Sequence, residues 1–175
     1  MGVSDLFSLP YLGMKDGYHT YKFEVDSHFF KNFISSPIDS GAFEIHLDVD
    51  KRGSLSEFMF SISGKVDTSC DRCLASIELP VTGTFKMHGK ISSIEGDDED
   101  IIYIKPDQSH IDLSQYIYEL ICLSIPQIKV YDCAIEVPKV CDEVILSKLQ
   151  TETPNDIEND NPDLWSNIQG LSIEE

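Results

Sequence analysis

Basic residues are scarce in this chain. Its 175 residues include 13 Lys and Arg against 31 Asp and Glu, which gives a formal net charge of -18. A chain this acidic repels nucleic acid at long range unless its few basic groups gather in one place. The composition therefore argues against a protein that coats nucleic acid with most of its surface.

Long apolar runs are missing as well. No segment approaches the roughly 18 consecutive apolar residues of a membrane-spanning helix. The first residues, Met1–Leu6, lack the basic and apolar stretches of a secretory signal, and Leu6 stands where a myristoylation signal needs Ser or Thr. We therefore expect a cytoplasmic protein without a membrane partner. Its five cysteines are then reduced thiols or metal ligands rather than a disulfide framework.

The sequence also lacks the familiar motifs of catalysis and nucleotide binding. It contains no H-E-x-x-H, G-x-S-x-G, G-x-x-x-x-G-K-[ST] or G-x-G-x-x-G pattern, and its five histidines show no metal or catalytic spacing. The clustered carboxylates lie in acidic runs, which are usually solvated. We predict a protein that is not an enzyme and has no small-molecule substrate.

Alternation of apolar and polar residues is the main structural pattern that the sequence does contain. It covers residues 18–25, 43–49, 58–66 and 77–91, and residues 101–105 form a shorter candidate strand. The segment Lys51–Ser54 turns the chain between the second and third of these runs. This arrangement predicts a β-hairpin.

Helix signals are fewer. Asp26 or Ser27 suits the N-cap of a short helix, and Asp112-Leu-Ser-Gln115 resembles a capping box before a helix that Pro126 ends. The pattern predicts an α+β fold: a mainly antiparallel, strongly bent sheet or partial barrel with two or three helices. We expect one domain over residues 1–148 and an acidic, partly disordered tail over residues 149–175.

The most specific short motif is Cys70-Asp-Arg-Cys73. Two thiols on a tight turn supply half of a tetrahedral zinc site, and folding could bring Cys133 and Cys141 to the same ion. Structural zinc and unligated reduced thiols are equal alternatives. A thioredoxin-type redox site is disfavoured because a strand, rather than a helix, is expected after the motif. We interpret Cys122 as a small core residue.

The basic residues are unevenly distributed. Residues 51–90 carry six basic and four acidic side chains, a net charge of +2, whereas the rest of the chain carries seven basic and 27 acidic ones, a net charge of -20. The segment around the cysteine motif can therefore present a basic face to RNA phosphates, although lysines are also ordinary solubilising residues of exposed strands. The candidate phosphate contacts are Lys51, Arg52, Lys65, Arg72, Lys86 and Lys90.

An apolar island interrupts the acidic tail. Leu164, Trp165, Ile168 and Leu171 are spaced as on one face of a short amphipathic helix. Such an island either docks on the domain of the same chain or binds a groove of a partner. Both interpretations remain open.

Several short motifs follow one another in a recognisable order. They are Cys70-Asp-Arg-Cys-Leu74, Ile111-Asp-Leu-Ser114, Glu119-Leu-Ile-Cys-Leu-Ser-Ile-Pro126, the two later cysteines, and Asn161-Pro-Asp-Leu-Trp165. This series, over roughly residues 43–165, resembles the YceD family, the large ribosomal RNA subunit accumulation proteins. The tail departs from the family pattern, which tends to have an Arg before the Trp where this chain has Asp163-Leu164.

The resemblance implies a non-catalytic factor for biogenesis of the large ribosomal subunit, which promotes accumulation or processing of 23S rRNA. Family genes often neighbour the gene of a small zinc-ribbon protein of the large subunit. The implied partner is thus the 23S rRNA precursor or a basic ribosomal protein, and the net charge suits the protein better. Two alternatives are a zinc-stabilised or thiol-redox protein using Cys70 and Cys73, and an acidic interaction domain that acts through its tail.

Overall fold

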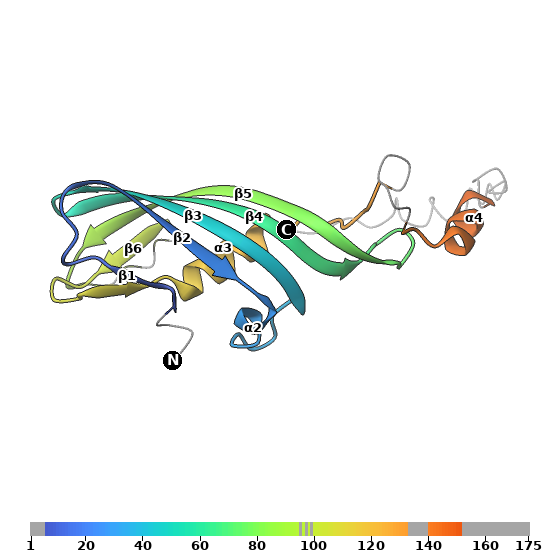
Figure 1. The fold of residues 1–175 in the computed structure, drawn as a ribbon, viewed down its shortest axis with the longest axis horizontal. Helices are drawn as coiled ribbons and strands as arrows, with labels where there is room; N and C mark the ends of the chain where they lie inside the picture. The colour runs from blue at the N-terminus through green and yellow to red at the C-terminus, as the bar shows by residue number, and fades with distance from the viewer. Residues whose placement is uncertain (1–5, 95, 97, 99, 133–139, 152–175) are drawn as a thin grey trace, which may run out of the picture.

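The computed structural model of the protein describes residues 6–94, 96, 98, 100–132 and 140–151 (Figure 1). Its strands, in chain order, are β1 (Ser8–Pro10), β2 (Gly17–Val25), β3 (Ser40–Arg52), β4 (Leu55–Ser69), β5 (Ser76–Ile91), β6 (Ile101–Ile104) and β7 (His110–Asp112). Its helices are α2 (Ser27–Phe30), α3 (Ser114–Ser124) and α4 (Glu143–Thr151).

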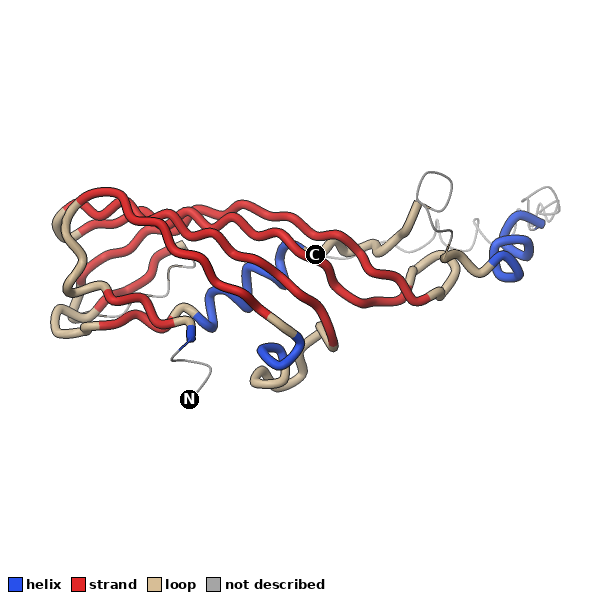
Figure 2. Tube along the Cα trace, in the orientation of Figure 1, coloured by secondary structure: helices blue, strands red, loops and turns tan. Residues whose placement is uncertain are grey.

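One five-stranded sheet dominates the fold. Its strand order is β2-β3-β4-β5-β6, and β1 pairs with β7 in a separate two-stranded ribbon. Neighbours from β2 to β5 are antiparallel, whereas β6 is parallel to β5. The long strands curve along their length, so that the sheet arches over α3 (Figures 1 and 2). The described sheet is open, because its edge strands β2 and β6 do not pair with each other.

The core lies on the inner, concave face of this sheet. The period of two in β3 and β4 sets it: Ile45 lies opposite Ile62, and Leu47 opposite Phe60, with all four side chains buried. The inner-facing residues of α3 close the core from the other side. They are Ile117, Leu120 and Ile121.

A glycine allows the C-terminal end of α3 to approach β5 closely. A Cβ atom added to Gly83 would lie 2.3 Å from Oγ of Ser124, well inside van der Waals contact. The Ser124 hydroxyl is held there by its hydrogen bond to the carbonyl oxygen of Leu120, at 2.7 Å. Gly83 therefore helps to fix how α3 sits beneath the sheet.

The expected bent, mainly antiparallel α+β sheet is confirmed, and of the two forms expected, a bent sheet or a partial barrel, the described strands form an open sheet. Asp26 does cap α2, accepting hydrogen bonds from the backbone N–H groups of His28 and Phe29. The helix entry expected at Asp112–Gln115 is confirmed, since α3 begins at Ser114 and the Asp112 carboxylate accepts a hydrogen bond from the Ser114 backbone N–H. The capping box is not completed, because the side chain of Gln115 bonds Glu119.

Three elements were missed by the sequence pattern. Strands β1 and β7 are three residues long, too short to show a period, and α4 ends at Thr151, beyond the domain boundary expected at residue 148. Most of the expected tail, residues 152–175, lies outside the described residues. No described helix has the length and apolar character needed to cross a membrane.

Candidate functional site

The cysteine motif forms the turn between β4 and β5. The backbone N–H of Cys70 donates to the carbonyl of Ala75, and that of Leu74 donates to the carbonyl of Cys70, both at 2.8 Å. Leu74 has a φ of 59°, in the left-handed region, which closes the turn. Both cysteine side chains are fully buried, whereas Asp71 and Arg72 between them are exposed.

A segment distant in sequence docks on this turn. The backbone N–H of Asp71 donates to the carbonyl of Lys129 at 2.8 Å, and the backbone N–H of Lys129 donates back to the Asp71 carboxylate at 2.6 Å. The chain after α3 is thereby tied to the tip of the β4–β5 hairpin. The motif thus joins two parts of the fold.

Cys70 has an unusually acidic thiol. Burial acts to raise its pKa, but N–H groups of the Tyr131, Cys73 and Arg72 backbone and the Cys73 thiol donate towards the sulfur, and together they lower the pKa to about 7. We expected no such shift, because no helix follows the motif. Backbone amides of the turn and of the docked segment lower the pKa of Cys70 in place of a helix dipole. Predicting helices and strands alone does not reveal such amides.

The other cysteines do not complete a metal site among the described residues. No group of three His, Cys, Asp or Glu side chains there is arranged to hold a metal ion. Cys141 is half-buried and disulfide-bonded, which removes its thiolate as a ligand in this state, and Cys133 lies outside the described residues. Cys122 lies in α3, where burial raises the pKa of its thiol, but it is only half-buried and packs at the margin of the core rather than within it. Of the four predicted zinc ligands the structure describes three, and of these only Cys70 and Cys73 are free thiols.

Lys51 departs most clearly from the predicted basic face. It continues the inward-facing series of β3, which includes Leu47 and Val49, and it is only 8% exposed. Its ammonium group donates to the carbonyl oxygens of Tyr11, at 3.0 Å, and Met14, at 2.8 Å. A lysine committed in this way is not available to RNA, so the prediction that it contacts phosphate is corrected.

Three of the remaining predicted contacts are paired with acids. Arg52 pairs with Asp50, Lys65 with Glu78 at 3.4 Å, and Lys86 with Glu57 at 2.7 Å. The hydrogen bond from Arg52 also lowers the pKa of Asp50, which keeps this acid ionised. The other two of these predicted contacts, Arg72 and Lys90, form no ion pair with a described residue, and both are exposed.

The outer face of the sheet is mixed rather than basic. It is formed by the even-numbered residues of β2, β3 and β5 and the odd-numbered residues of β4. Its basic side chains are Lys22, Arg52, Lys65, Lys86 and Lys90, and its acidic ones are Glu24, Glu44, Asp48, Asp50, Glu57, Asp67 and Glu78. The antiparallel register brings acids of β2 and β3 beside the 51–90 segment, so the local excess of positive charge is lost.

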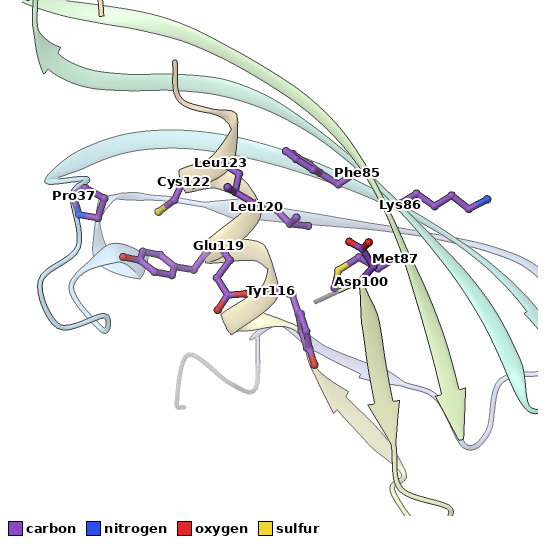
Figure 3. Close-up of a pocket in the computed structure, with 11 residues that line it drawn as sticks. Pro37, Phe85, Lys86, Met87, Asp100, Tyr116, Glu119, Leu120, Cys122 and Leu123 are labelled. Atoms are coloured by element: carbon purple, nitrogen blue, oxygen red, sulfur yellow. The ribbon is translucent and has the colours of Figure 1, made fainter. Parts of the chain in front are cut away.

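A groove that the sequence did not predict lies between β5 and α3 (Figure 3). It has a volume of about 690 Å³. Apolar side chains of both elements line it, including Phe85 and Met87 from β5 and Leu120 and Leu123 from α3. A concave, mainly apolar surface of this size is a common form of binding site.

The sequence that carries these sites matches a known family. The model of the family described as large ribosomal RNA subunit accumulation protein YceD matches residues 58–172, well over half of the chain. The chain belongs to the YceD family. No curated protein and no solved structure gives a match.

The YceD match covers the part of the fold that follows β3. It begins at Phe58 in β4 and includes β5, the cysteine turn, α3 and α4, whereas β1 to β3 precede it. The match starts later and ends later than the resemblance over residues 43–165 suggested. The cysteine turn lies in the part that this protein shares with the YceD family, as does the whole lining of the groove except Pro37.

Not every predicted site of this YceD protein falls on described residues. The apolar island of Leu164, Trp165 and Ile168 lies outside them, so its docking in cis or in trans stays a prediction. The burial of Lys51, in contrast, could have been found from the sequence, because the period of two in β3 places it with Val49. The groove could not, since it depends on how α3 packs against β5.

Proposed function

We propose that this YceD protein acts as a non-catalytic factor for the large ribosomal subunit and promotes accumulation of 23S rRNA by binding a basic ribosomal protein. The observation that carries the choice of partner is the charge of the sheet. Among the described outer-face side chains, seven acidic groups outnumber five basic ones. An acidic surface attracts a basic protein and repels RNA.

Direct binding of the rRNA precursor is the competing proposal. Of the six predicted phosphate contacts only Arg72 and Lys90 support it, since Lys51 is buried and Arg52, Lys65 and Lys86 are paired with acids. RNA binding through phosphates normally needs several unpaired basic groups on one surface. We therefore favour the protein partner.

Purification of the tagged full chain with and without ribonuclease treatment separates these proposals. A basic large-subunit protein that remains bound after the RNA has been digested supports the protein partner. Loss of all large-subunit components on digestion, together with loss in Arg72→Gln and Lys90→Gln variants, supports direct RNA binding. Recovery of neither rRNA nor large-subunit proteins contradicts the proposed function.

The cysteine turn favours a second, structural proposal. A Cys70 thiol with a pKa of about 7 is largely ready to act as a thiolate ligand, and the backbone N–H groups that lower this pKa are typical of turns that hold metal. Complete burial of both thiols argues against access for a thiol-redox substrate. We therefore propose structural zinc, which Cys141 can join as a ligand only after a thiol reductant has converted its disulfide to free thiols.

A further inference from the structure

The β5 strand is only partly covered at its outer edge. Strand β6 pairs with it only over His88–Ile91, although β5 begins at Ser76. The backbone N–H of His88 donates to Asp100 and that of Ser92 donates to Ile104, so even-numbered residues direct their backbone groups towards this edge. By the same alternation, the backbone N–H and C=O groups of Thr82, Thr84 and Lys86 point towards this edge. No strand of the described residues lies beside them.

Pro80 marks the same edge in the sequence. It has no N–H group, and it shares the parity of Thr82 and Thr84. A proline is tolerated in a strand where its missing N–H would face an unpaired edge. The presence of Pro80 therefore supports the assignment of this edge. It also shows that β5 can contain a proline whose missing N–H faces the edge and still pair with β4.

The groove described above runs beside this open edge. Its lining includes Phe85 and Met87, which flank the edge-facing Lys86, together with Leu123 of α3, which is 71% exposed. In Figure 3, Phe85 and Leu123 lie towards each other, whereas the ammonium group of Lys86 points away from the groove. A strand added to this edge would therefore place alternate side chains over an apolar surface.

The charged groups around the groove are mainly acidic. Asp100 and Glu119 line it. Lys86, the one basic residue of the lining, is paired with Glu57 on the outer face of the sheet. The free charge at the groove is therefore negative.

We infer that the open edge of β5 binds an extended, basic segment of a partner protein, which adds to the sheet as a strand and packs its apolar side chains into the groove against α3. This inference rests on the proposed function and names the contact surface for the basic partner. The chain's own tail is a poor occupant, because residues 149–175 carry seven acids and no basic residue. RNA is a poor one because the groove presents carboxylates.

A short fluorescent peptide of alternating lysine and valine is a suitable probe for the purified full chain. We expect it to bind with an affinity that weakens as salt is added. The same peptide with N-methylated alternate amides keeps its charge and side chains but cannot pair with a strand edge on that side. It should bind about tenfold or more weakly, because it loses several backbone hydrogen bonds. Equal binding of the two peptides would overturn strand addition.

Thr84→Pro is the matching change in the protein. It removes one edge-facing N–H, as Pro80 already does along the strand, and should weaken binding of the unmodified peptide about tenfold. Leu123→Ser should weaken it several-fold by removing apolar contact, whereas Leu12→Ser, at an exposed residue away from the groove, should not. Glu119→Gln should reduce binding at low salt, with Asp107→Asn as the control. If Thr84→Pro fails to fold, the N-methylated peptide still decides.

The alternatives give different outcomes. Failure of the unmodified protein to bind the probe overturns the inference, as does a labelled RNA oligonucleotide whose binding is lost in Thr84→Pro. A dimer of the unmodified protein that dissociates in this variant would instead assign the edge to a second copy. If large-subunit proteins still co-purify equally with Thr84→Pro and Leu123→Ser, the proposed function stands and the groove is not its contact. If they co-purify with no variant and not with the unmodified protein, the proposed function itself fails.

Discussion

The ammonium group of Lys51 lies 4.4 Å from the centroid of the Tyr11 ring and donates a 3.0 Å hydrogen bond to the Tyr11 carbonyl. Tyr11 makes a second buried contact through its side chain, because its hydroxyl lies 2.5 Å from the hydroxyl of Ser56. Lys51 thus joins the segment before β2 to the end of β3 from inside the fold. The residue that the charge pattern assigned to an RNA surface is a structural one.

Replacement of Lys51 by alanine should destabilise the protein by about 2–4 kcal/mol, because two buried carbonyl groups lose their donor and the cation–π contact is lost. Urea unfolding measures this. Lys65→Ala, in the same charged segment but exposed, is the control and should leave the unfolding free energy nearly unchanged. Equal effects of the two changes would contradict a structural role for Lys51.

Gly83→Ala should destabilise the protein by about 1–3 kcal/mol, because the new methyl group would clash with Ser124 at the end of α3. Combining it with Ser124→Ala should restore part of the loss by removing the nearest atom. Gly13→Ala, where no atom lies within 4 Å of the added Cβ, should cost little. Thermal unfolding compares the four proteins, and absence of rescue would argue that α3 is not held at this contact.

The stability that Cys70 contributes should depend on pH. Its folded-state pKa, about 7, lies below the ordinary value for a thiol, so the thiolate is favoured in the folded state. The contribution is therefore complete above the unfolded-state pKa and is lost as the pH falls towards and through 7. Unfolding free energies of the metal-free protein should rise between about pH 7 and pH 9. Cys70→Ala should flatten this rise, and Cys122→Ala should not.

Zinc binding can be tested by native mass spectrometry of the protein purified under reducing conditions. If the proposed structural site exists, the full chain carries one zinc ion, which is lost in Cys73→Ser but retained in Cys122→Ser. A chelator should then also lower the melting temperature, because metal binding is coupled to folding. A metal-free mass with four reduced cysteines at positions 70, 73, 133 and 141 would contradict the proposal.

Deletion of residues 152–175 tests the tail. If Trp165 and its apolar neighbours bind the partner, the truncated chain should lose the large-subunit protein that the full chain recovers. If the groove at β5 is the contact surface, the truncated chain should still bind, and the lysine–valine probe should bind it unchanged. Trp165→Ala in the full chain is the milder variant that keeps the tail charge.

The cysteine motif shows which features of a site can be predicted from the sequence and which cannot. The spacing of Cys70 and Cys73 and the strand pattern around them predicted a turn between two strands, because both are local properties. The lowered pKa of Cys70 was not foreseen, because one of its donors is Tyr131, which a distant segment brings to the turn.

By itself the sequence determined the alternating strands, the β3–β4 hairpin, the helix before Pro126 and the family, since each depends on periodicity or on ordered motifs. The alternation of β3 also indicated that Lys51 is buried, because its odd number places it on the same face as Val49. Only the tertiary structure decided which acids lie beside which bases across the sheet, and that β6 pairs only with the last four residues of β5, leaving the rest of this edge without a strand partner among the described residues. These properties depend on strand order and register, and pairing between distant segments is not encoded in any local pattern.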